Sequence, residues 1–152
     1  MVRVLFVCLG NICRSPMAEF ILKDAVQKNG WEVEVASAGT SSEEEGNPVY
    51  PPAKAELSAH GIRCDRKRAV VLKREDYAKY DYILCMESRN VQNAIRILGG
   101  DTDGKVFRLL DFSDEPKDIA DPWYTRDFSK AYQEICIGVN SFLEFLQGKN
   151  KI

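Results

Sequence analysis

Residues 8–15, Cys-Leu-Gly-Asn-Ile-Cys-Arg-Ser, place a thiol and a guanidinium at the two ends of a short loop that contains glycine. The apolar residues 2–7 predict a buried strand before this loop, and the Ser-Pro pair at 15 and 16 predicts a helix start capped by Ser15. Backbone amides in such a loop and in the first turn of a helix converge on an anion, which the helix dipole also favours. The segment therefore predicts a phosphate site, with Cys8 at the end of the strand.

The side chains of this loop suit nucleophilic chemistry on that phosphate. Gly10 and Asn11 are residue types that tolerate the left-handed backbone of an anion cradle. The planar guanidinium of Arg14 can hold two phosphate oxygens, more strongly as charge builds on them. A free thiol has a pKa of about 8.5, and helix N-termini or nearby cations lower the pKa of a thiol to roughly 3.5–7.5. We therefore expect Cys8 to be a thiolate nucleophile, the competing interpretation being a chance pattern around a buried cysteine.

Asp121 is the candidate general acid, because a thiolate that attacks a phosphate ester needs help in expelling the departing oxygen. Pro122 stiffens this loop and biases the residue before it toward extended backbone. Trp123 and Tyr124 can form the walls of a slot for a flat ring. The competing interpretation is a surface turn whose two aromatic residues fold back into the core.

The chain resembles the low-molecular-weight protein tyrosine phosphatases in residues 8–16, in Ser-Ala-Gly-Thr at 37–40, in the strand-like residues 81–86 and in Asp-Pro-Trp-Tyr at 121–124. The likeness covers nearly the whole chain in the same order. It implies that Cys8 becomes a phosphocysteine, that Arg14 clamps the phosphate, and that Asp121 acts first as acid and then as base on water.

The resemblance also implies roles for the remaining site residues. The phosphate-binding residues would be Leu9, Gly10, Asn11, Ile12, Cys13 and Ser15. Asn11, Ser15 and Ser37 would form a hydrogen-bond network that supports the thiolate, with Trp123 and Tyr124 as the pocket walls. Cys13 would be the redox partner of Cys8, although a disulfide depends on a Cα separation that the sequence does not give.

The implied activity is hydrolysis of phosphotyrosine in proteins and of small aryl phosphates, without a cofactor or metal, with phosphate and other oxyanions as inhibitors. Two alternatives stay open: an arsenate reductase, which needs further cysteines to relay a disulfide, and a protein-arginine phosphatase, which tends to carry a small polar residue where this chain has Ile12. The joint presence of Cys8, Arg14 and Asp121 argues against a phosphotyrosine-binding module without catalysis.

Three departures from the family pattern bear on the site. Residues 41–46 read Ser-Ser-Glu-Glu-Glu-Gly where many members place an aromatic pocket wall, which predicts a more polar side. The histidine that often follows a Gly-Ile pair and braces the loop asparagine is missing or replaced after Gly61. Glu87 stands where aspartate is common. Residues 63–68 carry four basic residues, which predict a solvated face or, near the pocket mouth, a preference for acidic phosphopeptides.

The 152 residues, with 45% apolar residues and a net charge of −2, predict one globular domain over residues 1–152 and no nucleic-acid partner. We find neither a signal-peptide pattern nor an apolar run long enough to span a membrane, so we expect a cytoplasmic enzyme. Five cysteines in that compartment argue against a disulfide framework, and one histidine without a C-x-x-C pair argues against a zinc site.

Apolar patterning predicts strands over residues 2–7, 31–36, 80–85 and 105–110, and helices over 15–29, 52–60, 88–98 and 126–146. This alternation predicts an α/β fold, an open four-stranded parallel sheet with helices on both faces, and the resemblance implies the flavodoxin-like, phosphatase I type. Ligands bind at the carboxyl ends of such strands. Cys8 and the loop after the fourth strand meet there, which brings Asp121 within reach of the thiolate.

Overall fold

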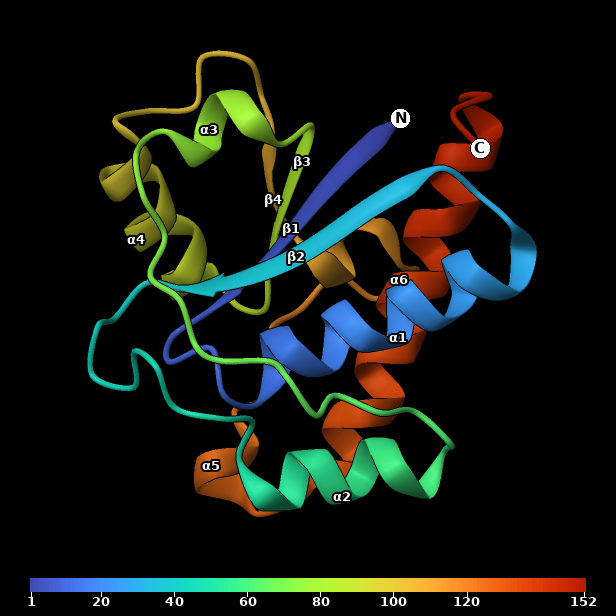
Figure 1. The fold of residues 1–152 in the computed structure, drawn as a ribbon. Helices are drawn as coiled ribbons and strands as arrows, with labels where there is room; N and C mark the ends of the chain where they lie inside the picture. Colours follow the sequence, from blue (N-terminus) through green and yellow to red (C-terminus); the bar gives the residue numbers. More distant parts are fainter.

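The computed structural model describes residues 1–152 and contains one four-stranded sheet with helices on both sides (Figure 1). The strands are β1 (Val2–Cys8), β2 (Val33–Gly39), β3 (Tyr82–Cys85) and β4 (Val106–Arg108). They lie in the order β2-β1-β3-β4, and every neighbouring pair is parallel. The predicted fold class is therefore confirmed.

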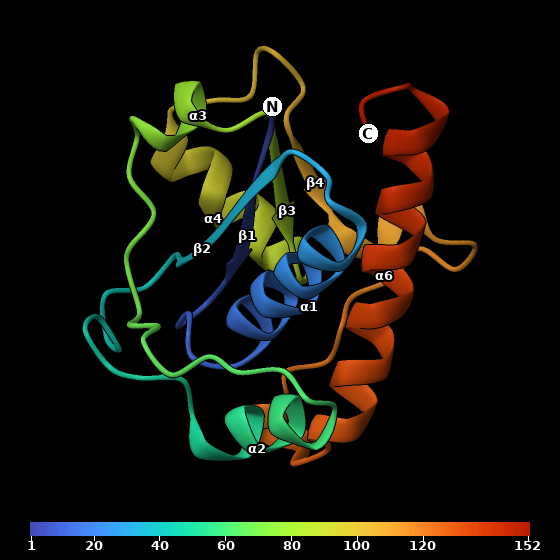
Figure 2. The same cartoon turned by 45° about the vertical axis from the view of Figure 1, so that its right-hand side comes forward.

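The helices fill the connections between these strands. They are α1 (Arg14–Asn29), α2 (Pro51–Ala59), α3 (Asp76–Lys79), α4 (Ser88–Leu98), α5 (Pro122–Thr125) and α6 (Phe128–Gly148), with a 3-10 helix η1 (Leu109–Phe112) after β4. Figure 2 shows α1 and α6 on one face of the sheet and α3 and α4 on the other. None of these helices is both long enough and apolar enough to cross a lipid bilayer.

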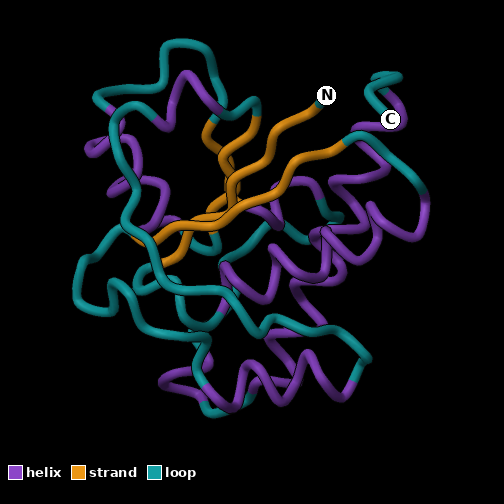
Figure 3. The backbone as a smooth tube through the Cα atoms, in the orientation of Figure 1, coloured by secondary structure: helices purple, strands orange, loops and turns teal.

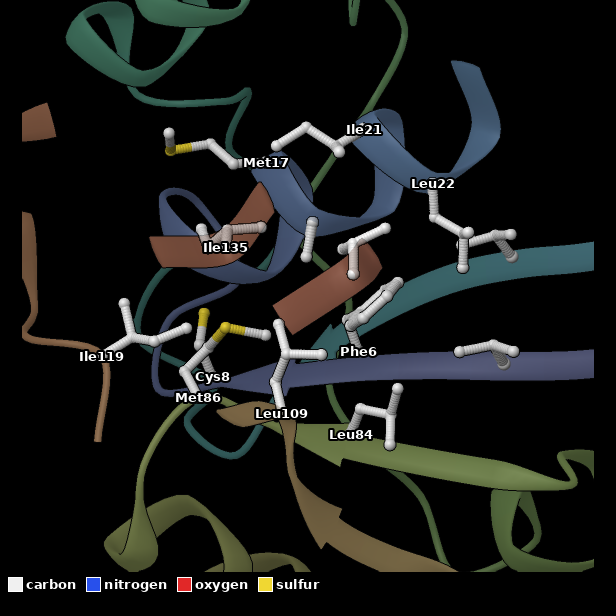
Figure 4. Close-up of a cluster of buried hydrophobic side chains, with 14 of the residues drawn as sticks. Phe6, Cys8, Met17, Ile21, Leu22, Leu84, Met86, Leu109, Ile119 and Ile135 are labelled. Atoms are coloured by element: carbon white, nitrogen blue, oxygen red, sulfur yellow. The ribbon is translucent and has the colours of Figure 1, made fainter. Parts of the chain in front are cut away.

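Alternation along β1 divides the buried side chains between two cores, because successive residues of a strand point to opposite faces. Val4 and Phe6 belong to the larger core beneath α1 and α6, whereas Leu5 and Val7 belong to the smaller core beneath α4. Figure 4 draws Cys8 among the side chains of the larger core, which also include Met86 and Ile119. Cys8 is thus anchored in a well-packed part of the structure.

Helix α4 and the end of α1 lie where the sequence predicts them. Gly30 and Gly99 follow these two helices with φ of 66° and 83°, the left-handed conformation that glycine adopts without strain. β2 begins later than expected and continues to Gly39, because its residues pair in register with β1 along the whole length of both strands.

The last third of the chain differs from prediction in two places. β4 ends at Arg108 instead of residue 110, because Leu109 and Leu110 turn inward as the 3-10 helix η1 and are buried. The long C-terminal helix begins at Phe128 instead of residue 126. Asp127 caps it by accepting from the Lys130 amide at 2.9 Å, and the short helix α5 precedes it. α3 was not predicted.

Candidate active site

The loop between β1 and α1 lies at the carboxyl edge of the sheet. After this loop and α1 the chain continues to β2, which pairs with one side of β1, whereas β3 pairs with the other side. A strand order that reverses in this way opens a crevice for ligands. Figure 3 shows that this edge of the sheet is surrounded by loops. The loop turns through Asn11, whose φ of 60° confirms the left-handed backbone expected there, whereas Gly10 does not have a positive φ.

A pocket opens directly over this loop. Its lining residues are Cys8, Leu9, Gly10, Ile12, Cys13, Arg14, Ser41, Glu43, Glu44, Asp121, Trp123 and Tyr124. The structure thus brings together the predicted nucleophile, phosphate clamp, general acid and aromatic walls, which come from two distant parts of the chain. Asn11, Ser15 and Ser37 are buried beside this pocket and do not line it.

Ser15 does not cap α1, which corrects the sequence prediction. The helix begins at Arg14 with Cys13 at the cap position, and no side chain caps it. The Ser15 hydroxyl instead lies 2.9 Å from the Cys8 sulfur, because position 15 falls on the face of the first helical turn that points back to β1. The residue therefore contacts the predicted nucleophile.

The predicted supporting network is present around Asn11. Its Nδ2 donates to Ser15 Oγ at 2.8 Å and to Ser37 Oγ at 2.9 Å. Its Oδ1 accepts from the Val70 amide at 3.0 Å. These bonds fix the amide in one orientation. The asparagine is braced without a histidine, and a backbone amide takes part in that role.

Arg14 is 1% exposed, and its guanidinium is held on three sides. Nη1 donates to the Ile119 carbonyl at 2.8 Å, while Nη2 lies 3.4 Å from both Glu87 Oε1 and Asp121 Oδ2. Burial lowers the pKa of Arg14, but the neighbouring negative groups outweigh it and the net pKa is raised. The cation is thus permanent, and Glu87, which departs from the family pattern, orients it.

Asp121 occupies the N-cap of α5, where its Oδ1 accepts from the Trp123 amide at 3.0 Å. Its side chain is 20% exposed and lines the pocket. One oxygen is therefore engaged in the cap and the other lies near Arg14, so the carboxyl group has a fixed direction.

The two aromatic residues after Pro122 form a rim and are not folded into the core. Trp123 packs against Tyr50 with ring centroids 4.7 Å apart, and the Arg126 guanidinium lies 5.6 Å from its ring. Tyr124 is 77% exposed. Tyr50 and Arg126 were not identified from the sequence, since neither is near the loop or the acid in a recognisable pattern.

Part of the pocket lining is polar, as residues 41–46 predict. Ser41, Glu43 and Glu44 line it, and the Glu44 side chain lies over Gly10. The basic residues at 63–68 line a separate groove beside α1. Arg63, Arg66 and Arg68 are exposed, as expected of a solvated face, whereas the Lys67 side chain is only 11% exposed.

The cysteines differ in environment. Burial and the charge of Cys8 raise the pKa of Cys13 to about 12, which keeps this thiol protonated at neutral pH. Burial also raises the pKa of Cys85, which is fully enclosed in the smaller core. No group of three or more His, Cys, Asp or Glu side chains is arranged to hold a metal ion.

Comparison with known proteins agrees with this geometry. The family model described as "Low molecular weight phosphotyrosine protein phosphatase" matches residues 3–151. The chain belongs to the low-molecular-weight protein tyrosine phosphatase family. It is therefore a hydrolase of the cysteine-based, metal-independent kind.

Individual relatives of this phosphatase extend over the whole chain. It is 35% identical to the low molecular weight protein-tyrosine-phosphatase YfkJ of Bacillus subtilis, with all of both chains covered. It is 36% identical to PtpA of Staphylococcus aureus strain Newman, over 96% of this chain and 94% of that one. The crystal structure of YfkJ superposes with a TM-score of 0.94 at 36% identity, covering 98% of this chain and 96% of that one. A phosphatase structure from Streptococcus pyogenes gives a TM-score of 0.86 at 36% identity, covering 96% and 93%.

Proposed function

We propose that this phosphatase hydrolyses phosphotyrosine in proteins, and small aryl phosphates, through a phosphocysteine on Cys8. The observation that carries the proposal is that Cys8, Arg14 and Asp121 line one pocket, with Asp121 Oδ2 3.4 Å from Arg14 Nη2. A nucleophile, a clamp for equatorial oxygens and a proton donor are the groups that phosphate-ester cleavage through a covalent intermediate requires.

In the first step, the Cys8 thiolate attacks phosphorus and forms the S–P bond. The P–O bond to the aryl group breaks, its electron pair goes to the phenolic oxygen, and the Asp121 carboxylic acid gives that oxygen its proton. Arg14 and the loop amides stabilise the charge on the three equatorial oxygens. Because Arg14 is already bound by Ile119 and Glu87, it needs little rearrangement to do so.

In the second step, the Asp121 carboxylate takes a proton from water while the water oxygen attacks phosphorus. The S–P bond breaks, the electron pair returns to sulfur, and inorganic phosphate leaves. The Ser15 hydroxyl, 2.9 Å from the Cys8 sulfur, donates to the thiolate that re-forms. Inorganic phosphate and other tetrahedral oxyanions inhibit by occupying the same cradle.

The pocket walls favour an aryl group next to the phosphate. Trp123 and Tyr124 stand on one side, and Ile12 adds a buried apolar surface at the loop. An apolar residue at position 12 offers no hydrogen bond to a guanidinium, which disfavours phosphoarginine. Arsenate reduction needs further cysteines to which a disulfide is passed. Cys64 and Cys85 cannot form such a pair, because they are buried in different cores.

The test uses purified protein, p-nitrophenyl phosphate and a phosphotyrosine peptide. We expect turnover of both by the natural sequence without added metal and in the presence of a chelator. Cys8→Ser should show no turnover above background while still binding the phosphopeptide. Phosphoarginine release or thiol-dependent arsenate reduction that exceeds aryl phosphate hydrolysis would overturn the proposal.

Cys13 fits the role of redox partner. It lines the pocket with Cys8. Its raised pKa leaves little of the thiolate that attacks an oxidised neighbour at neutral pH, so disulfide formation should become faster as the pH rises. Peroxide converts the Cys8 thiolate to a sulfenic acid. Attack by the Cys13 sulfur then forms the S–S bond and releases water, which stops further oxidation.

A further inference from the structure

The proposed general acid belongs to α5, a helix of one turn whose own hydrogen bonds do not fix its place over the phosphate loop. Asp121 caps this turn and Arg126 ends it. The Trp123 amide donates to Asp121 Oδ1 at 3.0 Å, and the Arg126 amide donates to the Pro122 carbonyl at 2.9 Å. Both bonds lie within the turn, so they hold only its shape. The position of Asp121 relative to Cys8 must therefore depend on contacts with other parts of the chain.

Tyr50 provides such contacts from the residue that precedes α2, and Figure 1 shows the start of α2 beside α5. Its ring packs against that of Trp123, with centroids 4.7 Å apart. Its hydroxyl accepts a hydrogen bond from Arg126 Nη1 at 3.0 Å. The Arg126 guanidinium also lies 5.6 Å from the centroid of the Trp123 ring. Each of these three side chains thus contacts the other two, and we call the three residues the Tyr50 cluster.

The same tyrosine is bound to the phosphate loop. Its backbone amide donates to the Ile12 carbonyl at 2.9 Å. Tyr50 therefore joins the loop of the nucleophile, through its backbone, to the helix of the acid, through its side chain. Neither Tyr50 nor Arg126 lines the pocket, so any effect they have on the reaction must pass through Trp123 or Asp121.

Arg126 has a backbone conformation that favours glycine. Its φ is 63°, and it stands at the C-terminal end of α5, where glycine commonly adopts the left-handed conformation. A residue with a Cβ is strained there. Such strain persists where the surrounding structure holds the residue in place, and it often marks a functional site. The contacts that glycine could not make here are the hydrogen bond to Tyr50 and the contact with the Trp123 ring.

We propose that Tyr50 and Arg126 are positioning residues for the general acid. Their hydrogen bond holds α5 against the start of α2, and the Tyr50 amide holds that start against the phosphate loop, so Asp121 stays within reach of the leaving oxygen. The proposal rests on the proposed function, since it assigns these two residues to the same reaction. A misplaced proton donor costs most where the leaving group most needs the proton.

The first test variant is Tyr50→Phe, which removes the hydroxyl but keeps the ring beside Trp123 and the amide bond to Ile12. The measurement is kcat/KM across aryl phosphates of graded phenol pKa, because kcat/KM reports the step in which the P–O bond breaks. Phenyl phosphate should lose about fivefold, the effect of one hydrogen bond, whereas p-nitrophenyl phosphate should lose less than about twofold. The inhibition constant of inorganic phosphate should not change, because the loop amides and Arg14 stay in place.

The second variant, Arg126→Gly, removes the other partner and suits the fold, because glycine adopts a φ of 63° without strain. It should reproduce the selective loss with phenyl phosphate. Arg126→Lys, which keeps a cationic donor, should retain most of the activity. The double variant of Tyr50→Phe and Arg126→Gly should lose no more than Arg126→Gly alone, because both changes break the same hydrogen bond.

Tyr77→Phe is the matched control. It removes a hydroxyl that donates to Asp101 Oδ1 at 2.8 Å from α3, and this residue does not line the pocket. The variant loses a hydrogen bond of the same kind at a place remote from the acid. It should leave the whole substrate series unchanged.

Three results would overturn the proposal: an unchanged series in Tyr50→Phe, a loss that is equal for all leaving groups, or a double variant whose losses multiply. An equal loss would mean that the Tyr50 cluster shapes the aromatic wall and does not place the acid. Failure of the proposed function is a separate result, because the natural sequence would then hydrolyse no aryl phosphate.

Discussion

Arg14 and Asp121 lie next to each other in one pocket, with 3.4 Å between Nη2 and Oδ2, although they come from the first helix and from the loop before α5. The proposed phosphate clamp is therefore placed to orient the proposed general acid as well. No local sequence pattern contains this relationship, and it is the geometry on which the acid assignment depends.

Replacement of Asp121 by asparagine should slow substrates with poor leaving groups far more than those with good ones. A positioned general acid contributes about 100- to 10,000-fold, and a phenolate that leaves easily needs little of it. The measurement is kcat across aryl phosphates of graded phenol pKa. Asp118→Asn is the control, because this carboxylate is bound to Arg108 and Ser88 outside the pocket. Equal losses across the series would refute the assignment.

Gly39→Ala should damage both stability and catalysis. A Cβ at position 39 would lie 2.7 Å from the Leu9 carbonyl oxygen, so the phosphate loop would have to shift. Overpacking of this kind costs about 1–3 kcal/mol of unfolding free energy. Urea unfolding and kcat/KM are the measurements. Gly148→Ala, where the new methyl group meets nothing, should be neutral in both.

The charge of the pocket rim should select among phosphopeptides. Glu43 is exposed and lines the pocket, whereas Arg66 and Arg68 line a different groove. Peptides with lysine beside the phosphotyrosine should therefore have higher kcat/KM than those with glutamate. Glu43→Lys should change this preference by about fivefold at low salt, equivalent to about 1 kcal/mol for two charges near 4 Å in water. Arg66→Glu should leave the preference unchanged, and a reversed response of the two variants would contradict the prediction.

The stability of the protein should fall in alkaline solution in part through Cys13. Its pKa is raised from the usual 9.0 to about 12 in the folded protein, so above pH 9 the unfolded chain releases a proton that the folded chain keeps. The free energy of unfolding then falls with pH by about 1.4 kcal/mol per unit for this group, from pH 9 toward pH 12. Below pH 9 the thiol contributes no slope.

Cys13→Ala tests this contribution. The free energy of unfolding, measured with urea between pH 8 and 10.5, should fall less steeply with pH in the variant. The difference in slope should approach about 1.4 kcal/mol per pH unit, the value for one proton. Identical slopes in the two proteins would show that Cys13 ionises as easily when folded as when unfolded.

Peroxide treatment should join Cys8 to Cys13. We expect loss of two mass units and of activity, both reversed by dithiothreitol. In Cys13→Ala, the same treatment should cause inactivation that dithiothreitol does not reverse, because the sulfenic acid has no neighbouring thiol. Reversible inactivation of that variant would remove Cys13 from the role.

The local features of this protein can be predicted from its sequence. The thiol, the left-handed Asn11 and Arg14 fall within eight residues, so the strand, loop and helix that hold them follow from short-range pattern. Apolar runs and the glycines that follow helices are also local signals, and they predict the alternating order of strands and helices. That order in turn predicts the parallel sheet.

The contacts between distant groups, in contrast, become visible only in the folded protein. Ser15 reads as a helix cap in sequence but faces the Cys8 sulfur, and Lys67 reads as part of a solvated basic run but is buried against Glu19. These contacts depend on how α1, β2 and the loop before α3 pack on one another. The physical reason is that a hydrogen bond or ion pair depends on distance in space, and residues far apart in sequence carry no local mark of it.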